Sequence, residues 1–279
     1  MSKRKRTSNI EKWIKEGRGA GIGADYQPWL KIQDVSSLGR STRLKGIKTG
    51  RQHEFLSDLE RNYFYLTEFS DSVFDIREQF PLLPHEETIL IADELGIEHP
   101  RHPKTGEYVV MTTDFVLTVE NRNQQVDVAR TVKSKEDLFN ERITQKFEIE
   151  REYWSRRDTN WAIVTEEEID KIYARNISYI HSYYTISHFE NFQGMLNLLL
   201  EDLKLEYIKR LLNPIMTIRE ISNQFDKDTN LASGSGLSIF YHLIINKAIS
   251  VDLSQELRVD EIIEIVSIEN NILEKVKYG

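Results

Sequence analysis

The sequence of 279 residues contains no cysteine. This absence excludes a disulfide framework, a thiolate metal site and a thiol nucleophile. It is consistent with a reducing compartment, and we expect a cytoplasmic protein. No apolar run approaches the roughly 20 residues needed to span a bilayer, and no apolar core of a secretory signal follows the basic start MSKRKR. Neither a membrane protein nor a secreted protein is therefore expected.

The charge of the chain is unevenly distributed. The net charge is −8, which by itself argues against binding to nucleic acid. Residues 1–54, however, contain 13 Lys and Arg against 5 Asp and Glu, whereas residues 175–279 contain 10 against 14. A basic arm on an otherwise acidic protein predicts local contact with phosphates. An equally weighted alternative is a solvated tail that aids solubility.

Residues 40–170 follow the pattern of a mixed α/β domain with a central sheet. Ser57 and Glu60 have the spacing of a capping box, which predicts the start of a helix. The expected elements are a hairpin of Arg43–Ile47 and Arg51–Phe55, a helix from Ser57 to Phe69, a strand over Val73–Phe80, a helix over His85–Leu95, strands over Val109–Val119 and Val126–Val132, a long helix over Ser134–Arg156 and a strand over Trp161–Thr165. We expect the acidic run Glu166–Glu168 to begin the next helix.

The last third of the chain is expected to be mostly helical. Its expected elements are one helix or a helix pair over Phe189–Leu212, a capped helix from Thr217 to Phe225, an apolar helix over Leu237–Ile245, an extended segment over Ala248–Leu253 and a final helix over Val259–Val276. Helix, turn, helix and short strand is the order of a winged-helix module. We therefore expect two domains, residues 1–172 and 173–279.

Glu60, Asp114 and Lys133 are the candidate catalytic residues. Hydrolysis of a phosphodiester needs a hard cation, an activated water and charge stabilisation at phosphorus. Asp114 lies within a β-rich run, where aspartate is disfavoured and needs a reason. Lys133 ends the next expected strand, so the two side chains can lie together, and a lysine there can orient or deprotonate the attacking water. Glu60 would reach the metal from its helix.

Each of these residues also has a structural interpretation. Glu60 can close its capping box with Ser57, Asp114 can lie on a solvated face of the sheet, and Lys133 can be the basic edge of a strand. Gln79 either points into the cleft or occupies a plain ladder position. For Glu150 we favour an exposed helix face over a position beside the metal.

Several blocks of sequence resemble the transposon endonuclease subunit family known as TnsA. They occur in the family's order over about the first 170 residues. The blocks are KEGRG at residues 15–19, LSDLE at 56–60, DIREQFPLLP at 75–84, TDF at 113–115 and EREYW at 150–154. The block at 75–84 is the most specific of them.

The resemblance implies a restriction-endonuclease-like fold for the first domain and Mg²⁺ as the cofactor, with Mn²⁺ as a possible substitute. It implies a subunit that cuts transposon-end DNA at the 5′ ends of the element, leaving a 5′-phosphate and a 3′-hydroxyl. An integrase-like transposase subunit would cut and join the 3′ ends, and an ATP-dependent transposition regulator would be the other partner, contacted by the C-terminal domain. By the same resemblance, Glu60 and Asp114 are the metal carboxylates, Val132 lies with them at the metal, and Lys133 is the catalytic lysine.

One position departs from the pattern. The wider nuclease superfamily has an acid two residues before the lysine, and this family tends to have glutamine, but here the residue is Thr131. A hydroxyl is a poorer metal ligand than a carboxylate, so the number of metal ions stays open. Lys135 is a nearby alternative to Lys133.

Three functional hypotheses follow. The first is the endonuclease subunit, the second is a non-catalytic winged-helix adaptor that links the transposase and the regulator, and the third is a stand-alone restriction enzyme. The third needs a sequence-reading surface that the sequence does not show. The apolar helix Leu237–Ile245 contains no Lys or Arg, so we expect the C-terminal domain to bind protein and not DNA.

Overall fold

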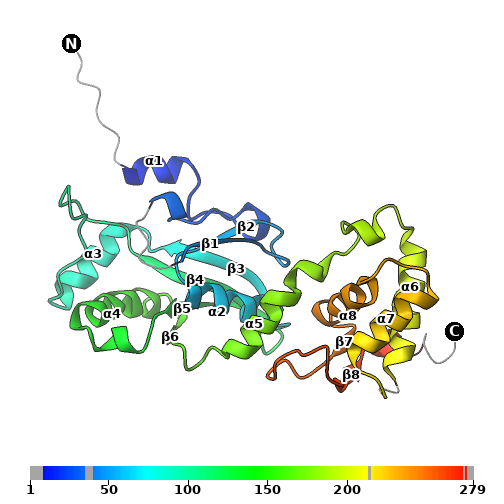
Figure 1. Cartoon of the computed structure of the whole chain (residues 1–279). Coiled ribbons are helices and arrows are strands. Elements are labelled where there is room, and N and C mark those ends of the chain that lie inside the picture. Colours follow the sequence, from blue (N-terminus) through cyan, green and yellow to red (C-terminus); the bar gives the residue numbers. More distant parts are fainter. Residues whose placement is uncertain (1–8, 35–39, 213–214, 273, 275–279) are drawn as a thin grey trace, which may run out of the picture. The chain divides into compact units, whose positions relative to one another are not determined.

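The computed structural model describes residues 9–34, 40–212, 215–272 and 274 (Figure 1). The basic start of the arm, residues 1–8, lies outside these ranges. The chain divides into two compact units, residues 1–169 and 170–279. Within the described ranges, every helix is too short or too polar to cross a membrane.

A four-stranded sheet forms the centre of the N-terminal unit, in the order β3-β4-β5-β6. Strands β3 (Val73–Pro81), β4 (Thr112–Asn121) and β5 (Gln124–Val132) are antiparallel, and β6 (Asn160–Val164) runs parallel to β5. The tight turn between β4 and β5 places Arg122 and Asn123 at φ of 50° and 64°, the positive values that a two-residue hairpin turn requires. The parallel pairing of β6 needs a crossover connection, which a helix supplies.

Helices cover both faces of this sheet (Figure 1). Phe115 and Val116 are neighbours on β4 and therefore point to opposite faces. Phe115 packs against Phe55 and Tyr63, with ring centroids 6.0 and 5.2 Å away, whereas Val116 belongs to the core that includes Ile149. The first face is covered by α2 (Asp58–Phe69) and the hairpin β1 (Thr42–Lys45) and β2 (Gln52–Phe55), and the second by α3 (His85–Glu94) and α4 (Glu141–Ser155). The expected mixed α/β domain is confirmed.

Helix α4 is shorter than the sequence pattern predicted. The predicted helix Ser134–Arg156 is wrong in its first part, because residues 136–139 form a separate 3-10 helix, η3 (Glu136–Phe139). Asn140 has extended backbone angles, and its side chain accepts hydrogen bonds from the backbone N–H groups of Arg142 and Ile143. Asparagine is a strong helix N-cap because its side chain satisfies these otherwise unpaired donors. The chain therefore turns at Asn140 and the helix begins afterwards.

The acidic run Glu166–Glu168 does not begin a helix. Glu168 instead accepts hydrogen bonds from the N–H and Oγ1 of Thr165, both at 2.7 Å, in a turn. Helix α5 (Lys171–Ile180) begins later, after Asp170, whose carboxylate caps its first N–H groups.

Helices dominate the C-terminal unit. The helix cap expected at Thr217 is confirmed, and Glu220 completes it as a capping box. Asp226 accepts hydrogen bonds from the N–H groups of Gly234 and Gly236, each at 2.7 Å, and so caps the start of α8. The elements of this unit are α5, η4 (His181–Tyr184), η5 (Glu190–Phe192), α6 (Asn197–Leu211), α7 (Ile218–Asp228), α8 (Ser235–Ile245), β7 (Ile249–Ser250) and β8 (Ser267–Ile268); the N-terminal unit also contains α1 (Asn9–Lys15), η1 (Gly23–Asp25) and η2 (Ile32–Asp34).

The predicted final helix Val259–Val276 is wrong. Within the described part of this segment, residues 259–266 are turns and irregular chain, and helical structure is present only from residue 270. Strand β8 pairs with β7 in an antiparallel ladder, Ile249 opposite Ile268. The segment is rich in β-branched residues, which have low helix propensity and fit a strand edge, so pairing with β7 prevails.

Candidate active site

Glu60 stands in the first turn of α2. Its carboxylate accepts hydrogen bonds from the backbone N–H of Leu56 at 3.0 Å and from Ser57 Oγ at 2.9 Å. Ser57 in turn accepts from the backbone N–H of Glu60 at 3.1 Å. The capping interaction expected from the sequence is thus present, and it holds the Glu60 side chain, which is 7% exposed, in one position.

Asp114 lies in β4, where its side chain replaces part of the sheet ladder. The backbone N–H of Val132, at the end of β5, donates to Asp114 Oδ2 at 2.8 Å. Asp114 is only partly buried. A backbone donor of the neighbouring strand therefore satisfies an aspartate within a strand.

Gln79 brings the two carboxylates together. Its Nε2 lies 3.5 Å from Glu60 Oε2 and 3.3 Å from Asp114 Oδ1, and its Oε1 accepts from Thr112 Oγ1 at 3.3 Å. Gln79 has a φ of 49° within β3, a conformation that costs energy for a residue other than glycine and is typical of functional sites. Of the two interpretations of Gln79, the geometry matches the one in which it points into the site.

Both carboxyl groups have raised pKa values. Burial raises the pKa of Glu60 to about 7, and the nearby charge of Asp114 adds to the increase. Burial also raises the pKa of Asp114 to about 6, although the Val132 N–H and the charge of Lys133 oppose the change. Two partly neutralised acids held side by side form a site that a cation would stabilise.

Lys133 is a cation whose charge acts on Asp114. Its backbone N–H donates to Val164 O at 2.9 Å, which fixes it between the ends of β5 and β6. Its side chain is 39% exposed, with Nζ 3.5 Å from Asp137 Oδ2. Lys135, the alternative lysine, instead pairs with Glu167 at 2.5 Å.

Glu150 and Thr131 meet on the side of the sheet that faces α4. Glu150 Oε1 accepts hydrogen bonds from Thr113 Oγ1 at 2.6 Å, from Trp161 Nε1 at 3.0 Å and from Thr131 Oγ1. Burial raises the pKa of Glu150 to about 7. The prediction of an exposed helix face for Glu150 is wrong, because the residue is 3% exposed. The Thr131 hydroxyl is directed at Glu150.

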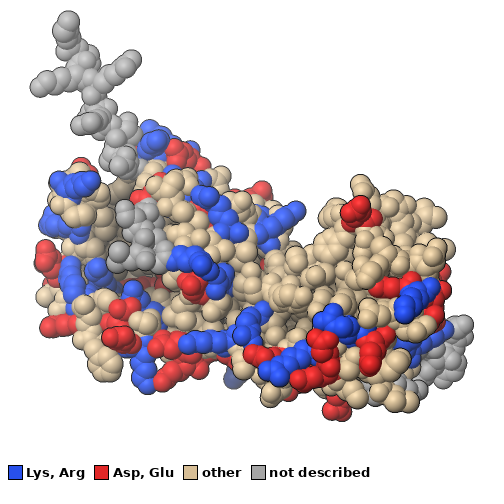
Figure 2. All heavy atoms as spheres, in the orientation of Figure 1, with Lys and Arg blue, Asp and Glu red and all other residues tan. Residues whose placement is uncertain are grey.

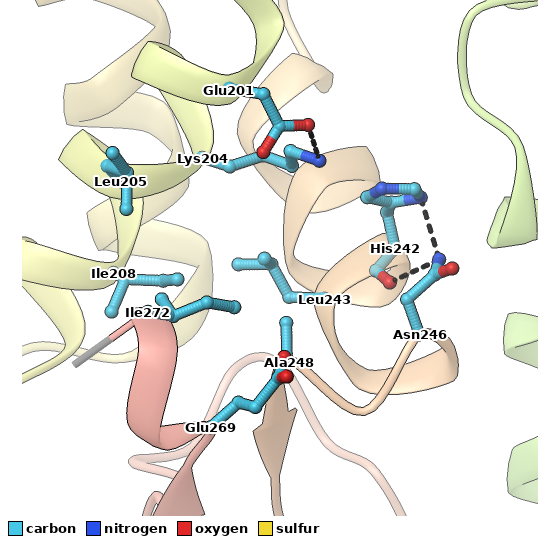
Figure 3. A pocket seen from close by; sticks show the side chains of 10 residues that line it. All are labelled: Glu201, Lys204, Leu205, Ile208, His242, Leu243, Asn246, Ala248, Glu269 and Ile272. Atoms are coloured by element: carbon cyan, nitrogen blue, oxygen red, sulfur yellow. Dashed lines mark hydrogen bonds and ion pairs between the residues drawn. The ribbon is translucent and has the colours of Figure 1, made fainter. Parts of the chain in front are cut away.

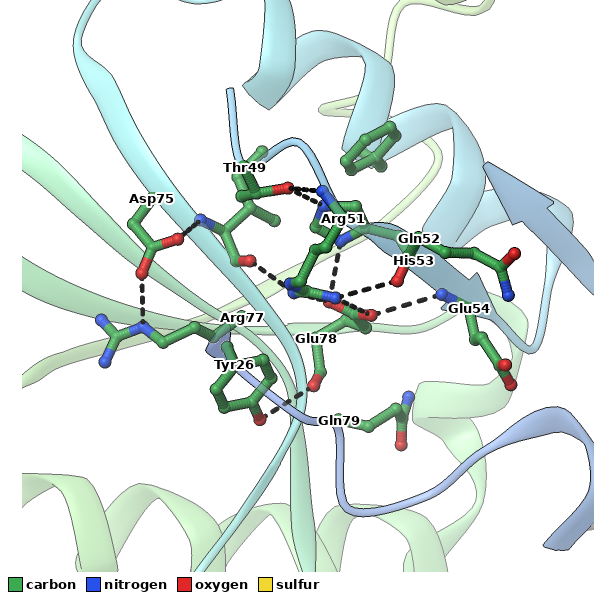
Figure 4. A network of polar contacts seen from close by, with 12 residues as sticks. Tyr26, Thr49, Arg51, Gln52, His53, Glu54, Asp75, Arg77, Glu78 and Gln79 are labelled. Atoms are coloured by element: carbon green, nitrogen blue, oxygen red, sulfur yellow. Dashed lines mark hydrogen bonds and ion pairs between the residues drawn. The ribbon is translucent and has the colours of Figure 1, made fainter. Parts of the chain in front are cut away.

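A buried ion network lies beside Gln79 on the other face of the sheet (Figure 4). Burial alone would raise the pKa of Glu78, but hydrogen bonds and charges of Arg51 and His53 lower it to about 2. Arg51 Nη1 lies 2.8 Å from Glu78 Oε1, and His53 Nδ1 lies 2.8 Å from Glu78 Oε2. Tyr26 donates to the Glu78 carbonyl at 3.0 Å. The sequence analysis did not identify this network, which fixes the strand next to the strained Gln79.

The residues present fit a hard divalent cation. In the described ranges no three His, Asp or Glu side chains come together as a metal cluster. Mg²⁺ needs fewer, because it prefers oxygen ligands, keeps several waters and binds through one or two carboxylates. Glu60 and Asp114 supply two such carboxylates, and burial raises the pKa of both, an effect that a bound cation would offset.

Comparison with known proteins gives matches along most of the chain. Residues 70–166 match the family described as TnsA-like endonuclease N terminal, and residues 168–253 match TnsA endonuclease C terminal. Over 173 residues the chain is 45% identical to the Escherichia coli protein named Transposon Tn7 transposition protein TnsA. That alignment covers 62% of the chain and 62% of the relative, so the chain spans less than two thirds of the relative's length. The resemblance predicted from the sequence blocks is confirmed.

Proposed function

The chain belongs to the TnsA-like endonuclease family, and we propose that it is the Mg²⁺-dependent DNA endonuclease subunit of a heteromeric transposase. Its reaction would be hydrolysis of a phosphodiester at the 5′ ends of the transposon during cut-and-paste transposition. The observation that carries the proposal is the pair Glu60 and Asp114, bridged by Gln79 and placed beside Lys133.

The order of elements supports a restriction-endonuclease-like fold for the N-terminal unit. A helix, α2, precedes three antiparallel strands, and the helix α4 then leads to the parallel strand β6. The candidate residues come from the start of α2, from β4 and from the end of β5. Such a layout gathers chemistry at one end of a rigid sheet, which suits a site that must hold its geometry.

We assign the roles within the site as follows. Glu60 and Asp114 would hold the Mg²⁺, with the backbone at Val132 beside them. When bound, the ion supplies Lewis-acid stabilisation of the phosphate charge and lowers the pKa of a water. Gln79 orients both carboxylates. Lys133 orients the attacking water and offsets the charge that develops on the phosphate oxygens as the bond from phosphorus to the 3′ oxygen breaks.

For the C-terminal unit we propose a winged-helix-like module that binds a partner protein. The pair α7 and α8 followed by the short sheet of β7 and β8 supports this layout. Helix α8 is buried over most of its length, and its residues are mainly apolar. It therefore suits a core helix and not a recognition helix in a DNA groove.

The surface of this unit also suits a protein partner. Figure 2 shows charged side chains along its lower edge and a mostly uncharged area above them. Leu196 and Leu198 are 76% and 75% exposed at the start of α6. A pocket of about 220 Å³ lies between α6 and α8 (Figure 3). Apolar side chains such as Ile208 and Leu243 form half of its lining, and polar or charged ones such as Glu201 and His242 form the other half. Exposed apolar area of this kind marks interaction sites, and the integrase-like transposase and the ATP-dependent regulator are the candidate partners.

The proposal is tested by strand-specific cleavage of labelled transposon-end DNA in Mg²⁺. The native chain is compared with Asp114→Ala, each with the integrase-like transposase. Asp93→Ala serves as the matched control, because this exposed aspartate lies on α3 away from the site. We expect 5′-strand cutting by the native chain and the control and none by Asp114→Ala. Equal cutting by all three proteins would reject the site and favour the non-catalytic adaptor.

A further inference from the structure

One face of helix α4 carries a row of two cations that leads to the candidate site. Arg142, Lys146 and Glu150 are spaced four residues apart, so they lie on the same face of the helix. Glu150 marks where this face points, because it contacts Thr113 and Thr131 on the strands next to Asp114. At about 1.5 Å of rise per residue, Lys146 lies about 6 Å and Arg142 about 12 Å further along the axis.

Lys133 belongs to the same positive region. Burial lowers the pKa of Lys146, and the charges of Arg142 and Lys133 lower it further. The charges of Arg142 and Lys133 both act on Lys146, so the three side chains share one region. Lys133 also follows Thr131, a contact of Glu150, at the strand end toward which this face of α4 points. Lys146 and Arg142 are both partly buried, so the surrounding water screens this repulsion incompletely.

These cations differ from Arg151 on the same helix and from Arg156, which directly follows the helix. Arg151 pairs with Glu148 at 2.9 Å and Arg156 with Glu152 at 3.0 Å. Among the residues with described positions, by contrast, no carboxylate forms an ion pair with Arg142 or Lys146. The only side-chain partner that Arg142 shows there is the neutral Gln145, at 3.3 Å.

Two cations without an ion pair in the described part of the chain, Arg142 and Lys146, lie beside Lys133 in a protein of net charge −8. Their mutual repulsion is relieved when an anion reaches them. The nearest candidate anion is the substrate itself, since a DNA strand carries one phosphate per about 3.4 Å of helix axis. The roughly 6 Å of helix rise between Arg142 and Lys146 lies between one and two such steps, so the two long side chains can reach phosphates of neighbouring nucleotides. Phe139, which is 86% exposed just before α4, adds an aromatic surface of the kind on which bases stack.

We propose that Arg142 and Lys146 bind the backbone phosphates of the cleaved strand next to the scissile phosphate, so that α4 fixes the register of the strand over Asp114. This inference rests on the proposed endonuclease function for the identity of the scissile phosphate. The binding itself needs neither metal nor catalysis. Arg142 and Lys146 are therefore positioning residues, and their contribution is measurable in DNA binding alone.

The test is fluorescence anisotropy of labelled duplex DNA with the full chain in EDTA, over a series of KCl concentrations. We expect Arg142→Ala and Lys146→Ala each to weaken binding about 3- to 10-fold and to lower the salt slope by about 1. Lys146→Arg should bind as the native chain does. Arg151→Ala is the matched control, since it removes an equal charge from the same helix where a carboxylate already pairs with it.

Unchanged affinity and salt slope in the double variant Arg142→Ala, Lys146→Ala would overturn the inference, as would an equal loss in Arg151→Ala or no DNA binding by the native chain at low salt. Cleavage assays separate this result from the function itself. If the native chain binds DNA through Arg142 and Lys146 but never cuts it with the partner present, the phosphate-binding inference holds and the proposed endonuclease function is wrong. If the double variant binds and cuts DNA normally, the phosphate-binding inference is wrong and the proposed endonuclease function holds.

Discussion

The side-chain amide of Gln79 stands between two acidic side chains, with Nε2 3.5 Å from Glu60 Oε2 and 3.3 Å from Asp114 Oδ1. This contact depends on an unusual backbone, because Gln79 has a positive φ of 49° inside a strand. The Trp29 N–H donates to the Gln79 carbonyl at 3.1 Å and the Glu78 network fixes the preceding residue. The neighbours of Gln79 thus hold a conformation that the residue itself disfavours.

The backbone at Gln79 gives the first prediction. Gln79→Val places a β-branched residue in the left-handed backbone conformation, which such a residue strongly disfavours, whereas glycine adopts this conformation readily. We expect Gln79→Val to be less stable than Gln79→Gly by about 1–3 kcal/mol, measured by urea denaturation. Both variants lose the amide bridge, so the comparison isolates the backbone. Equal stability would show that the positive φ is not present in solution.

The raised pKa values of the acids give the second prediction. A carboxyl group whose folded pKa exceeds its unfolded value binds protons more tightly in the native state, so stability falls as pH rises through that interval. For Glu60 the interval runs from 4.5 to about 7, and for Asp114 from 3.8 to about 6. We therefore expect the metal-free protein to be less stable at pH 7.5 than at pH 5.

Asp114→Asn removes one of the two repelling charges. In EDTA at pH 7.5 we expect it to raise the free energy of unfolding by on the order of 1–2 kcal/mol while abolishing cleavage. The measurement is urea denaturation of both proteins at pH 5 and pH 7.5. The gain should shrink at pH 5, where Asp114 is mostly protonated in the native chain. A gain that is the same at both pH values would contradict an electrostatic origin.

The network around Glu78 gives the third prediction, with the opposite sign. Its folded pKa of about 2 lies below the ordinary 4.5, so its contribution to stability is present above pH 4.5 and is lost as pH falls toward 2. Glu78→Gln leaves Arg51 with an uncompensated buried charge. We expect this variant to lose about 3 kcal/mol of its free energy of unfolding at pH 7. Its free energy of unfolding should also change less than that of the native protein as the pH falls. The control is Glu120→Gln, at an exposed position on β4, which should change neither the free energy of unfolding at pH 7 nor its dependence on pH.

Much of the fold follows from patterns that are local in sequence. The caps at Ser57 and Thr217 mark helix starts that the structure retains. The strands around Asp114 were predictable because β-branched residues accumulate there, and the aspartate itself was conspicuous against that background. Family resemblance then singled out Glu60, whose local role as a capping residue conceals its place beside Asp114.

Most of the errors arise where a distant contact decides the outcome. The exception is Asn140, which delays the start of the predicted helix Ser134–Arg156 through a local cap that was readable from the sequence. The segment after Val259 could not be predicted locally, since its partner is the distant strand β7. Glu150 was predicted to lie on an exposed face of the long helix, but Thr113, Thr131 and Trp161 surround it in space. The positive φ of Gln79 has no sequence signal, since no glycine or asparagine occupies the position.

The fourth prediction decides between Lys133 and Lys135. The two side chains are two residues apart but face different surroundings. The charge of Lys133 acts on Asp114 and lowers its pKa, whereas Lys135 pairs with Glu167 at 2.5 Å. A lysine that orients water or offsets phosphate charge must lie at the carboxylates. Removing Lys133 should therefore slow cleavage about 10²- to 10⁴-fold, and removing Lys135 should leave the rate nearly unchanged.

The measurement is single-turnover cleavage of transposon-end DNA with the transposase partner, for Lys133→Ala and Lys135→Ala. DNA binding in EDTA is measured alongside, because a lysine near the phosphates also affects affinity. If Lys133→Ala lost only affinity, saturating DNA would restore the rate, and its role would be binding alone. A rate that stays low at saturation assigns Lys133 to the chemical step. The reverse pattern, with Lys135→Ala inactive and Lys133→Ala active, would require the strand end after Val132 to adopt a different register when DNA binds.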